Sequence, residues 1–212
     1  PIHNWLYLNK SQFMKRCILL MAIFAICMTA NAKDDFCDIL RSRIYMHLCQ
    51  LNDYLAFISD KSNDLETRQY YKKQALNMFI GRGYDYEENG IHKDGVKIII
   101  SSINNANSHT RTKLVRQYLN GLVNLTYQKV LIEVPQPSDC KVCDIQMIDD
   151  DHFTCFFYYS QAFIGKSDDA SIYKDVTQKK IKCYGERIEC EDGFEYSVLL
   201  GDIYAIDTKL LM

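Results

Sequence analysis

The sequence predicts an α+β protein in which helices dominate the first half of the chain and strands dominate the second. Apolar residues recur at helical spacing over residues 38–58, 63–79 and 114–122, whereas β-branched and aromatic runs divided by polar turns fill residues 127–207. The chain has 212 residues, is 48% hydrophobic and 25% charged, and contains only 9 Gly and 3 Pro. This composition is typical of one globular domain and excludes a disordered, collagenous or repeat protein.

The first two helices are predicted from an apolar stripe and from their end signals. The stripe that runs from Ile44 to Ile58 has a spacing of three to four residues, which predicts a helix over residues 38–58. Asn63 and Glu66 have the spacing of a capping box, so a second helix is expected to begin there and to continue to Phe79. Glycines 81 and 83 then allow the positive φ that ends a helix.

One strand and a third helix are expected next. Residues 84–93 are polar and acidic and are interpreted as a loop, and the β-branched run 96–103 predicts a strand. Residues 104–108 resemble a turn, and the apolar stripe of residues 114–122 predicts the third helix.

Five further strands are expected, over residues 127–134, 140–148, 153–164, 173–184 and 196–207. A turn centred on Asp169 would place Phe157 opposite Ile181 and Cys155 opposite Cys183. A second turn at Asp192 would place Ile181 opposite Ile203, with Leu199 and Ala205 on the same face. The odd-numbered residues of these strands are therefore expected to face the core.

The opposite, even-numbered face is unusually apolar for a solvated surface. It carries Lys180, Lys182 and Asp202, as expected, but also several large apolar residues: Phe156, Tyr158, Val198, Leu200 and Tyr204. One interpretation is a patch that a loop or the first helix covers. The other is an interface, with Phe156, Tyr158 and Tyr204 burying against a partner protein or a second copy in a homodimer.

The first 32 residues are expected to lie outside the folded domain. Residues 1–13 precede the first methionine and are interpreted as an upstream artefact of translation. Residues 14–32 have the basic, apolar and small-residue segments of a secretory signal peptide, with cleavage after Ala32 and a single domain over residues 33–212. The apolar segment is shorter than the about 20 residues that span a bilayer, so a retained anchor is the weaker alternative. Lipidation of Cys27 is disfavoured by the bulky Ile26 before it.

Charge and cysteine usage limit the partners of the mature domain. Without residues 1–32 it has 22 basic and 27 acidic residues, a net charge of −5, and it lacks a basic run with interleaved aromatic residues. We therefore expect no nucleic-acid partner. Seven cysteines remain after cleavage, and free buried thiols are expected for most of them because a core of this size needs no disulfide.

The predicted element order resembles that of the nuclear transport factor-like superfamily, a cone-shaped α+β fold that includes ketosteroid isomerases and related dehydratases. Residues 65–71 (LETRQYY), 161–163 (QAF) and 200–203 (LGDI) resemble segments of exported members from gut Bacteroidetes whose function is unassigned. The resemblance implies three N-terminal helices packed on a strongly bent, mostly antiparallel sheet of about six strands. It also implies a location in the periplasm or cell envelope of a Gram-negative bacterium.

Few motifs carry chemistry. Cys140 and Cys143 have C-x-x-C spacing, and His152 would be a third metal ligand, but a second cysteine pair is missing and incidental thiols are the simpler interpretation. The sequence has no H-E-x-x-H and no G-x-S-x-G motif, which disfavours the common hydrolases. A carboxylate could act as a base if it is buried beside a tyrosine. The candidates for this role are Asp53, Asp175 and Asp202.

We therefore expect an exported, non-catalytic module that binds a ligand or a protein and needs no cofactor. A small apolar ligand would contact four aromatic residues: Tyr54, Tyr71, Phe157 and Tyr159. The alternative is a small-molecule isomerase or dehydratase of the ketosteroid isomerase type that uses a buried carboxylate and a tyrosine.

Overall fold

A computed structural model describes residues 35–104, 107–134, 136–167, 170–191 and 193–210. The expected artefact and signal peptide of residues 1–32 lie outside these ranges. The chain divides into two compact units, residues 1–39 and 40–212, and the helices and strands pack together within the second unit. Within the described residues, no helix has the length and apolar character needed to cross a membrane.

Three α-helices form among the described residues, as the sequence predicts. The first runs over residues 35–59 and buries the stripe from Leu40 to Ile58. The second, α2 (Leu65–Asn77), begins one residue later than the predicted capping box, because the carboxylate of Asp64 accepts hydrogen bonds from the backbone and hydroxyl of Thr67. The third, α3 (Val115–Val123), packs through its buried Val115, Leu119, Leu122 and Val123.

Arg68 of α2 joins the ends of the two other helices. Its buried guanidinium donates from Nε to the carbonyl of Ile58 at 2.8 Å and from Nη2 to the carbonyl of Val123. These carbonyls belong to the last turns of helices 35–59 and α3, where a helix has no further backbone N–H groups to donate to them. Arg68 therefore fixes the three helices to one another.

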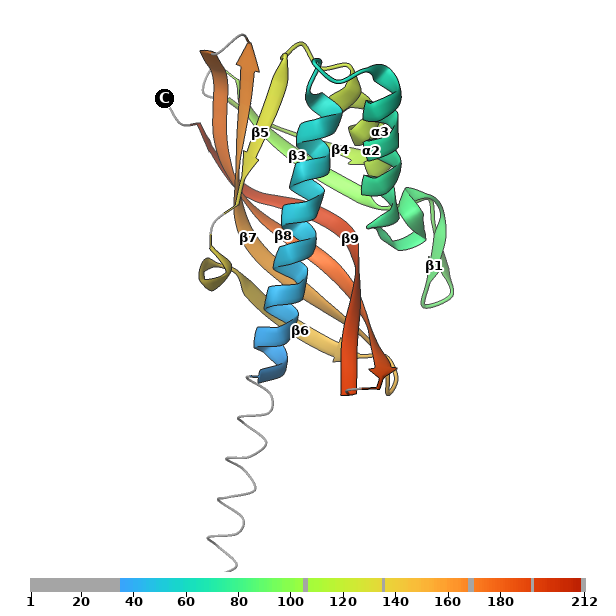
Figure 1. The fold of residues 1–212 in the computed structure, drawn as a ribbon. Coiled ribbons are helices and arrows are strands. Elements are labelled where there is room, and N and C mark those ends of the chain that lie inside the picture. Colours follow the sequence, from blue (N-terminus) through green and yellow to red (C-terminus); the bar gives the residue numbers. More distant parts are fainter. Residues whose placement is uncertain (1–34, 105–106, 135, 168–169, 192, 211–212) are drawn as a thin grey trace, which may run out of the picture. The chain divides into compact units, whose positions relative to one another are not determined.

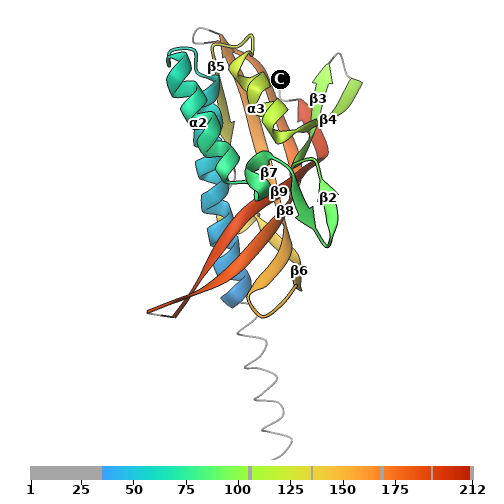
Figure 2. The same ribbon diagram turned by 90° about the vertical axis from the view of Figure 1, so that its right-hand side faces the viewer.

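In the described part of the chain, the main sheet has seven strands and is mostly antiparallel. The strands are β3 (Lys97–Asn104), β4 (Asn107–Leu114), β5 (Lys129–Glu133), β6 (Lys141–Met147), β7 (His152–Ser167), β8 (Ala170–Cys190) and β9 (Gly193–Leu210). Its order is β4-β3-β9-β8-β7-β5, and β6 pairs with the free half of β7. Among the described strands of this sheet, β3 and β9 alone run parallel, at the pair Ile98 and Ile203. The helix of residues 40–59 and α2 lie on one face of this sheet (Figures 1 and 2).

The main sheet has seven strands and not the expected six, because the sequence did not predict one polar strand. Residues 107–114, where a turn and the start of a helix were expected, form β4 at the sheet edge. Residues 84–93 were expected to be a loop, but β1 (Tyr86–Glu88) and β2 (Ile91–Lys93) form a separate two-stranded hairpin. Both segments lack the apolar alternation that identifies a half-buried strand.

The register of the long strands confirms the predicted cross-strand pairs. Phe157 lies opposite Ile181, Cys155 opposite Cys183, and Ile181 opposite Ile203. The prediction that Leu199 lies on the core face was wrong, because the β8–β9 register shifts between Ile181 and Cys183. This bulge reverses the face of the residues before it, so Leu200 and Val198 are 0% and 2% exposed whereas Leu199 is 39% exposed.

The sheet thus has an inner face, which carries the odd-numbered residues of β7 and packs against the helices, and an outer face, which carries the even-numbered ones. Gly185 leaves room on the inner face for the Phe153 ring opposite it. A Cβ atom at residue 185 would lie 2.0 Å from Cζ of that ring.

Candidate functional site

The inner face changes from apolar to polar along β7 and β8. At one end the cross-strand pairs are Cys155 with Cys183 and Phe157 with Ile181, all buried. At the other end the pairs are Tyr159 with Lys179, Gln161 with Thr177, and Phe163 with Asp175. Charged residues are rarely placed on the inside of a sheet without a partner or a function. We call Asn52, Gln161, Asp175 and Lys179 the inner-face cluster.

A chain of hydrogen bonds links three members of this cluster across the sheet and the first helix. The Lys179 ammonium donates to Oε1 of Gln161, and Nε2 of Gln161 donates to Oδ1 of Asn52 at 2.8 Å. Asn52 is 5% exposed and Gln161 is 7% exposed. The chain therefore lies between the helix layer and the sheet.

The chain ends on an unpartnered donor. Nδ2 of Asn52 is buried and has no hydrogen-bond acceptor among the described residues. A buried donor without an acceptor costs about 1–3 kcal/mol, so most such groups in proteins are satisfied. The Asn52 side chain therefore keeps an unused donor in the interior of the described structure.

Asp175 is the carboxyl group of the cluster and is 6% exposed. Burial raises its pKa, although the hydrogen bond from the Tyr173 hydroxyl and the charge of Lys179 act in the opposite direction. Of the three carboxylates that the sequence offered as bases, only Asp175 is buried. Asp53 is exposed, and Asp202 accepts a hydrogen bond from the backbone of Lys97 at the start of β3.

Burial also shifts the pKa values of the titratable groups around Asp175. Desolvation lowers the pKa of Lys179 to about 8, against the opposing charge of Asp175. The pKa of Tyr118 on α3 is raised to about 12 by burial and then by Asp175, and burial also raises the pKa of Tyr159. Lys179 and Tyr118 nevertheless keep part of their surface exposed. The cluster is therefore desolvated without being sealed from the solvent.

The four predicted pocket residues fall into two groups. Phe157 and Tyr159 are buried neighbours on the inner face, with ring centroids 5.9 Å apart. Tyr54 and Tyr71 belong to a group of aromatic side chains on the helices, with centroids 5.8 Å apart, and Phe57 stacks on Tyr71 at 4.5 Å.

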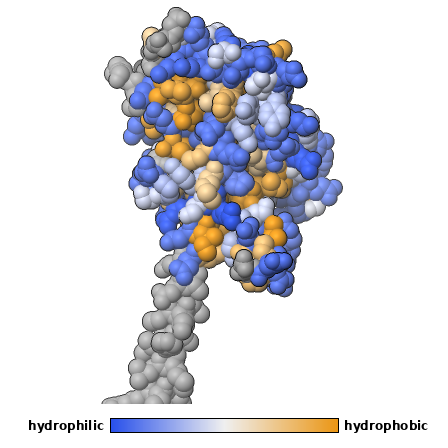
Figure 3. All heavy atoms as spheres, in the orientation of Figure 1, coloured by the Kyte–Doolittle hydropathy of each residue, from blue (hydrophilic) through white to orange (hydrophobic). Residues whose placement is uncertain are grey.

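On the side of the molecule that carries the first helix, apolar side chains appear in separate patches among hydrophilic ones (Figure 3).

The predicted interface residues Phe156, Tyr158 and Tyr204 are half-buried on the outer face. The Lys180 ammonium lies 3.7 Å from the ring centroid of Phe156 and 5.4 Å from that of Tyr158. This cation–π arrangement gives the two rings a partner within the chain.

The β1–β2 hairpin contacts the neighbouring part of the outer face. Glu88 pairs with the Lys182 ammonium and accepts a hydrogen bond from the Tyr184 hydroxyl at 2.7 Å. The hairpin therefore covers the part of the outer face at Lys182 and Tyr184, whereas the first helix, the other cover expected for this face, packs on the inner face.

The cysteine and histidine candidates do not form a metal centre. Among the described residues, no group of three His, Cys, Asp or Glu side chains is arranged to hold a metal ion. Cys140 is buried and donates from Sγ to the carbonyl of Gln136, whereas Cys143 is half-buried on β6.

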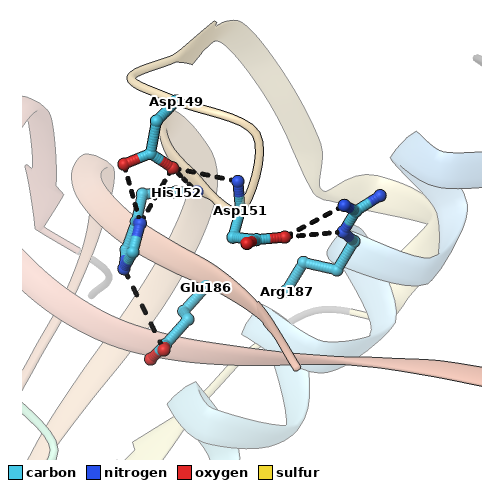
Figure 4. A network of polar contacts seen from close by, with 5 residues as sticks. All are labelled: Asp149, Asp151, His152, Glu186 and Arg187. Carbon is cyan, nitrogen blue, oxygen red and sulfur yellow. Dashed lines mark hydrogen bonds and ion pairs between the residues drawn. The ribbon is translucent and has the colours of Figure 1, made fainter. Parts of the chain in front are cut away.

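His152 instead belongs to an exposed network at the turn between β6 and β7 (Figure 4). Its Nδ1 lies 2.9 Å from Oδ1 of Asp149 and its Nε2 lies 3.9 Å from Glu186, while Arg187 pairs with Asp151. The hydrogen bond to Asp149 raises the pKa of His152. Because Asp149, Asp151, His152 and Glu186 are exposed and Arg187 is only half-buried, we interpret the network as a set of surface ion pairs that closes the turn.

Sequence reasoning named Asp175 and Tyr159 but missed Asn52, Gln161 and Lys179. One signal was available. Gln161, Asp175 and Lys179 are odd-numbered, and the predicted register assigned odd-numbered residues to the core. Polar residues on a predicted core face indicate a site.

The fold and the cluster define the class of the protein: an α+β domain with helices on one face of a mostly antiparallel sheet and a partly open polar cluster between the two layers. Comparison of the chain with protein-family models, curated proteins and solved structures finds no match.

Proposed function

We propose that this protein binds a small molecule at the inner-face cluster, as a non-catalytic module. The observation that carries the proposal is the buried Nδ2 of Asn52, which has no acceptor among the described residues and ends the hydrogen-bonded chain from Lys179. Retaining an unsatisfied amide and a desolvated lysine lowers the stability of the unliganded domain. A bound molecule that supplies acceptors would recover that free energy.

The setting of the module is part of the same proposal. We propose that residues 14–32 direct export and that the domain acts in the periplasm or cell envelope of a Gram-negative bacterium, as a member of the nuclear transport factor-like superfamily. The order of the three helices and the antiparallel strands supports this membership. N-terminal sequencing of the exported protein tests the location: the expected first residue is Lys33, and an intact segment 14–32 would contradict it.

A screen of small molecules by NMR tests the binding function. The side-chain amides of Asn52 and Gln161 give signals that respond to any molecule bound at the cluster. We expect some of the screened molecules to shift both signals in the native protein and to lose this effect in Lys179→Met. Lys180→Met is the matched control, because this neighbouring lysine lies on the outer face over Phe156. A diverse screen in which no bound molecule shifts either amide would refute the function.

A second candidate is an isomerase of the ketosteroid type, which the raised pKa of the buried Asp175 favours. Here the Asp175 carboxylate would take a proton from the carbon beside a substrate carbonyl and return it two carbons away, while a hydroxyl or ammonium donates to the developing oxyanion. Incubation of a β,γ-unsaturated ketone with the protein tests this reaction. Conversion to the conjugated ketone that Asp175→Asn abolishes would support catalysis, and no conversion above the uncatalysed rate would reject it.

A further inference from the structure

Two members of the inner-face cluster, Lys179 and Asn52, have N–H groups without an acceptor among the described residues. The Lys179 ammonium has three N–H groups, and its one acceptor among the described residues is Oε1 of Gln161. Asn52 has two N–H groups on a buried nitrogen without any acceptor in the described part of the chain. Both ends of the hydrogen-bonded chain therefore present donors.

The neighbouring carboxyl group does not supply the missing acceptors. Asp175 accepts a hydrogen bond from the Tyr173 hydroxyl, and no ion pair joins it to Lys179 among the described residues. Thr177, on the same face, has its hydroxyl 3.1 Å from that of Thr208 on β9. The hydrogen bonds of these two neighbours are directed elsewhere.

We infer that the molecule bound at the inner-face cluster carries a carboxylate, whose oxygens accept hydrogen bonds from the Lys179 ammonium and from Nδ2 of Asn52. A carboxylate has two acceptor oxygens and no donor. It therefore complements the two donor groups, Lys179 and Asn52, that the Gln161 side chain links. Its negative charge is opposite to that of the Lys179 ammonium, and burial of Asp175 favours the neutral form of the carboxyl group already in the cluster. A phosphate carries more charge than this lysine neutralises.

This inference rests on the proposed function and specifies the ligand class. A matched pair of probes, benzoate and benzamide, separates the two claims because the molecules have nearly the same shape and differ in the charged oxygen. We expect benzoate to shift the side-chain amide signals of Asn52 and Gln161 and to bind about tenfold more tightly than benzamide, as a charge-assisted hydrogen bond predicts.

Substitutions at the two donors sharpen the test. Lys179→Met and Asn52→Leu are each expected to weaken benzoate binding by about tenfold, whereas Lys180→Met leaves it unchanged. A measurement on the native protein avoids any effect of substitution on folding. Benzoate at saturation is expected to raise the pKa of Lys179, because a neighbouring anion stabilises the ammonium form.

The outcomes distinguish the claims. Equal affinity of the cluster for benzoate and benzamide would contradict the inference that the ligand carries a carboxylate, but it would still support the binding function. If benzoate does not shift the Asn52 amide signal while molecules without a carboxylate do, the carboxylate assignment is likewise wrong and the binding function stands. If neither the probes nor any molecule of the wider screen shifts this amide, both the ligand class and the proposed function are refuted.

Discussion

Gln161 of β7 donates a hydrogen bond of 2.8 Å to Asn52 of the first helix, across 109 residues of sequence. This bond ties the helix layer to the polar end of the inner face. It also orients the Asn52 amide, because the oxygen is used by Gln161 and the nitrogen is left without an acceptor in the described structure. The relationship therefore links the packing of the domain to its proposed binding site.

The first prediction concerns the ionisation of Lys179. We expect NMR titration to give a pKa of about 8 for this ammonium, because burial disfavours its charged form. Asp175→Asn is expected to lower it further, since Asp175 stabilises the ammonium. A pKa near the usual value for lysine would show that the cluster is solvated.

The lowered pKa of Lys179 also determines how its contribution to the free energy of unfolding changes with pH. The folded pKa lies below the unfolded value of 10.5, so the unfolded chain binds more protons between pH 8 and 10.5. Over this window the native protein should gain stability relative to Lys179→Met as the pH rises. A gain as the pH falls would contradict the assignment.

The second prediction concerns Gly185. Alanine at this position would place a Cβ 2.0 Å from the Phe153 ring, so we expect Gly185→Ala to lower the free energy of unfolding by about 1–3 kcal/mol. Gly121→Ala on α3 is the control. Nothing lies within 4 Å of its Cβ, and alanine favours helix, so this change should leave stability equal or higher. Chemical denaturation of both variants decides whether Phe153 packs as described.

The third prediction concerns Cys155 and Cys183, which lie opposite each other and are both free. Cross-strand Cβ atoms are about 4.5–5.5 Å apart, wider than the about 3.8 Å of a disulfide. Burial raises the pKa of the Cys183 thiol, which further slows its oxidation. We expect an alkylating reagent to modify neither thiol in the folded protein and both after unfolding. A disulfide-linked peptide containing the two cysteines would prove the expectation wrong.

The fourth prediction concerns the outer face, where self-association remains a hypothesis. If Phe156, Tyr158 and Tyr204 bury against a second copy, sedimentation should show a dimer that Tyr158→Glu weakens. Tyr70→Glu is a suitable control because Tyr70 is 58% exposed on α2. A monomer at all concentrations would eliminate the interface.

The fold class and most element positions could be predicted from the sequence because apolar periodicity identifies elements that bury one face. The pairing of Cys155 with Cys183 followed from a symmetric turn and the period of two. Strand β4 could not be predicted, because it is polar and lies at an edge. Leu199 was placed on the wrong face because a bulge between distant partners leaves no local sequence signal.

The candidate site was predictable only in part. Asp175 and Tyr159 could be named from their residue types, but Asn52 is one polar residue within an otherwise ordinary amphipathic helix. Its role depends on Gln161, which is brought to it only by the packing of the helix on β7. Long-range contacts of this kind are set by topology and not by local pattern.

The most direct test of the central claim, that the inner-face cluster serves binding and not folding, is the free energy of unfolding of the ligand-free triple variant Asn52→Leu, Gln161→Leu, Lys179→Met. Replacing all members of a buried polar chain by apolar residues of similar size removes their desolvation cost together. We expect the variant to be as stable as the native protein within about 1 kcal/mol, or more stable. A loss of more than about 3 kcal/mol would show that the hydrogen-bonded chain is needed for folding, and would contradict the account.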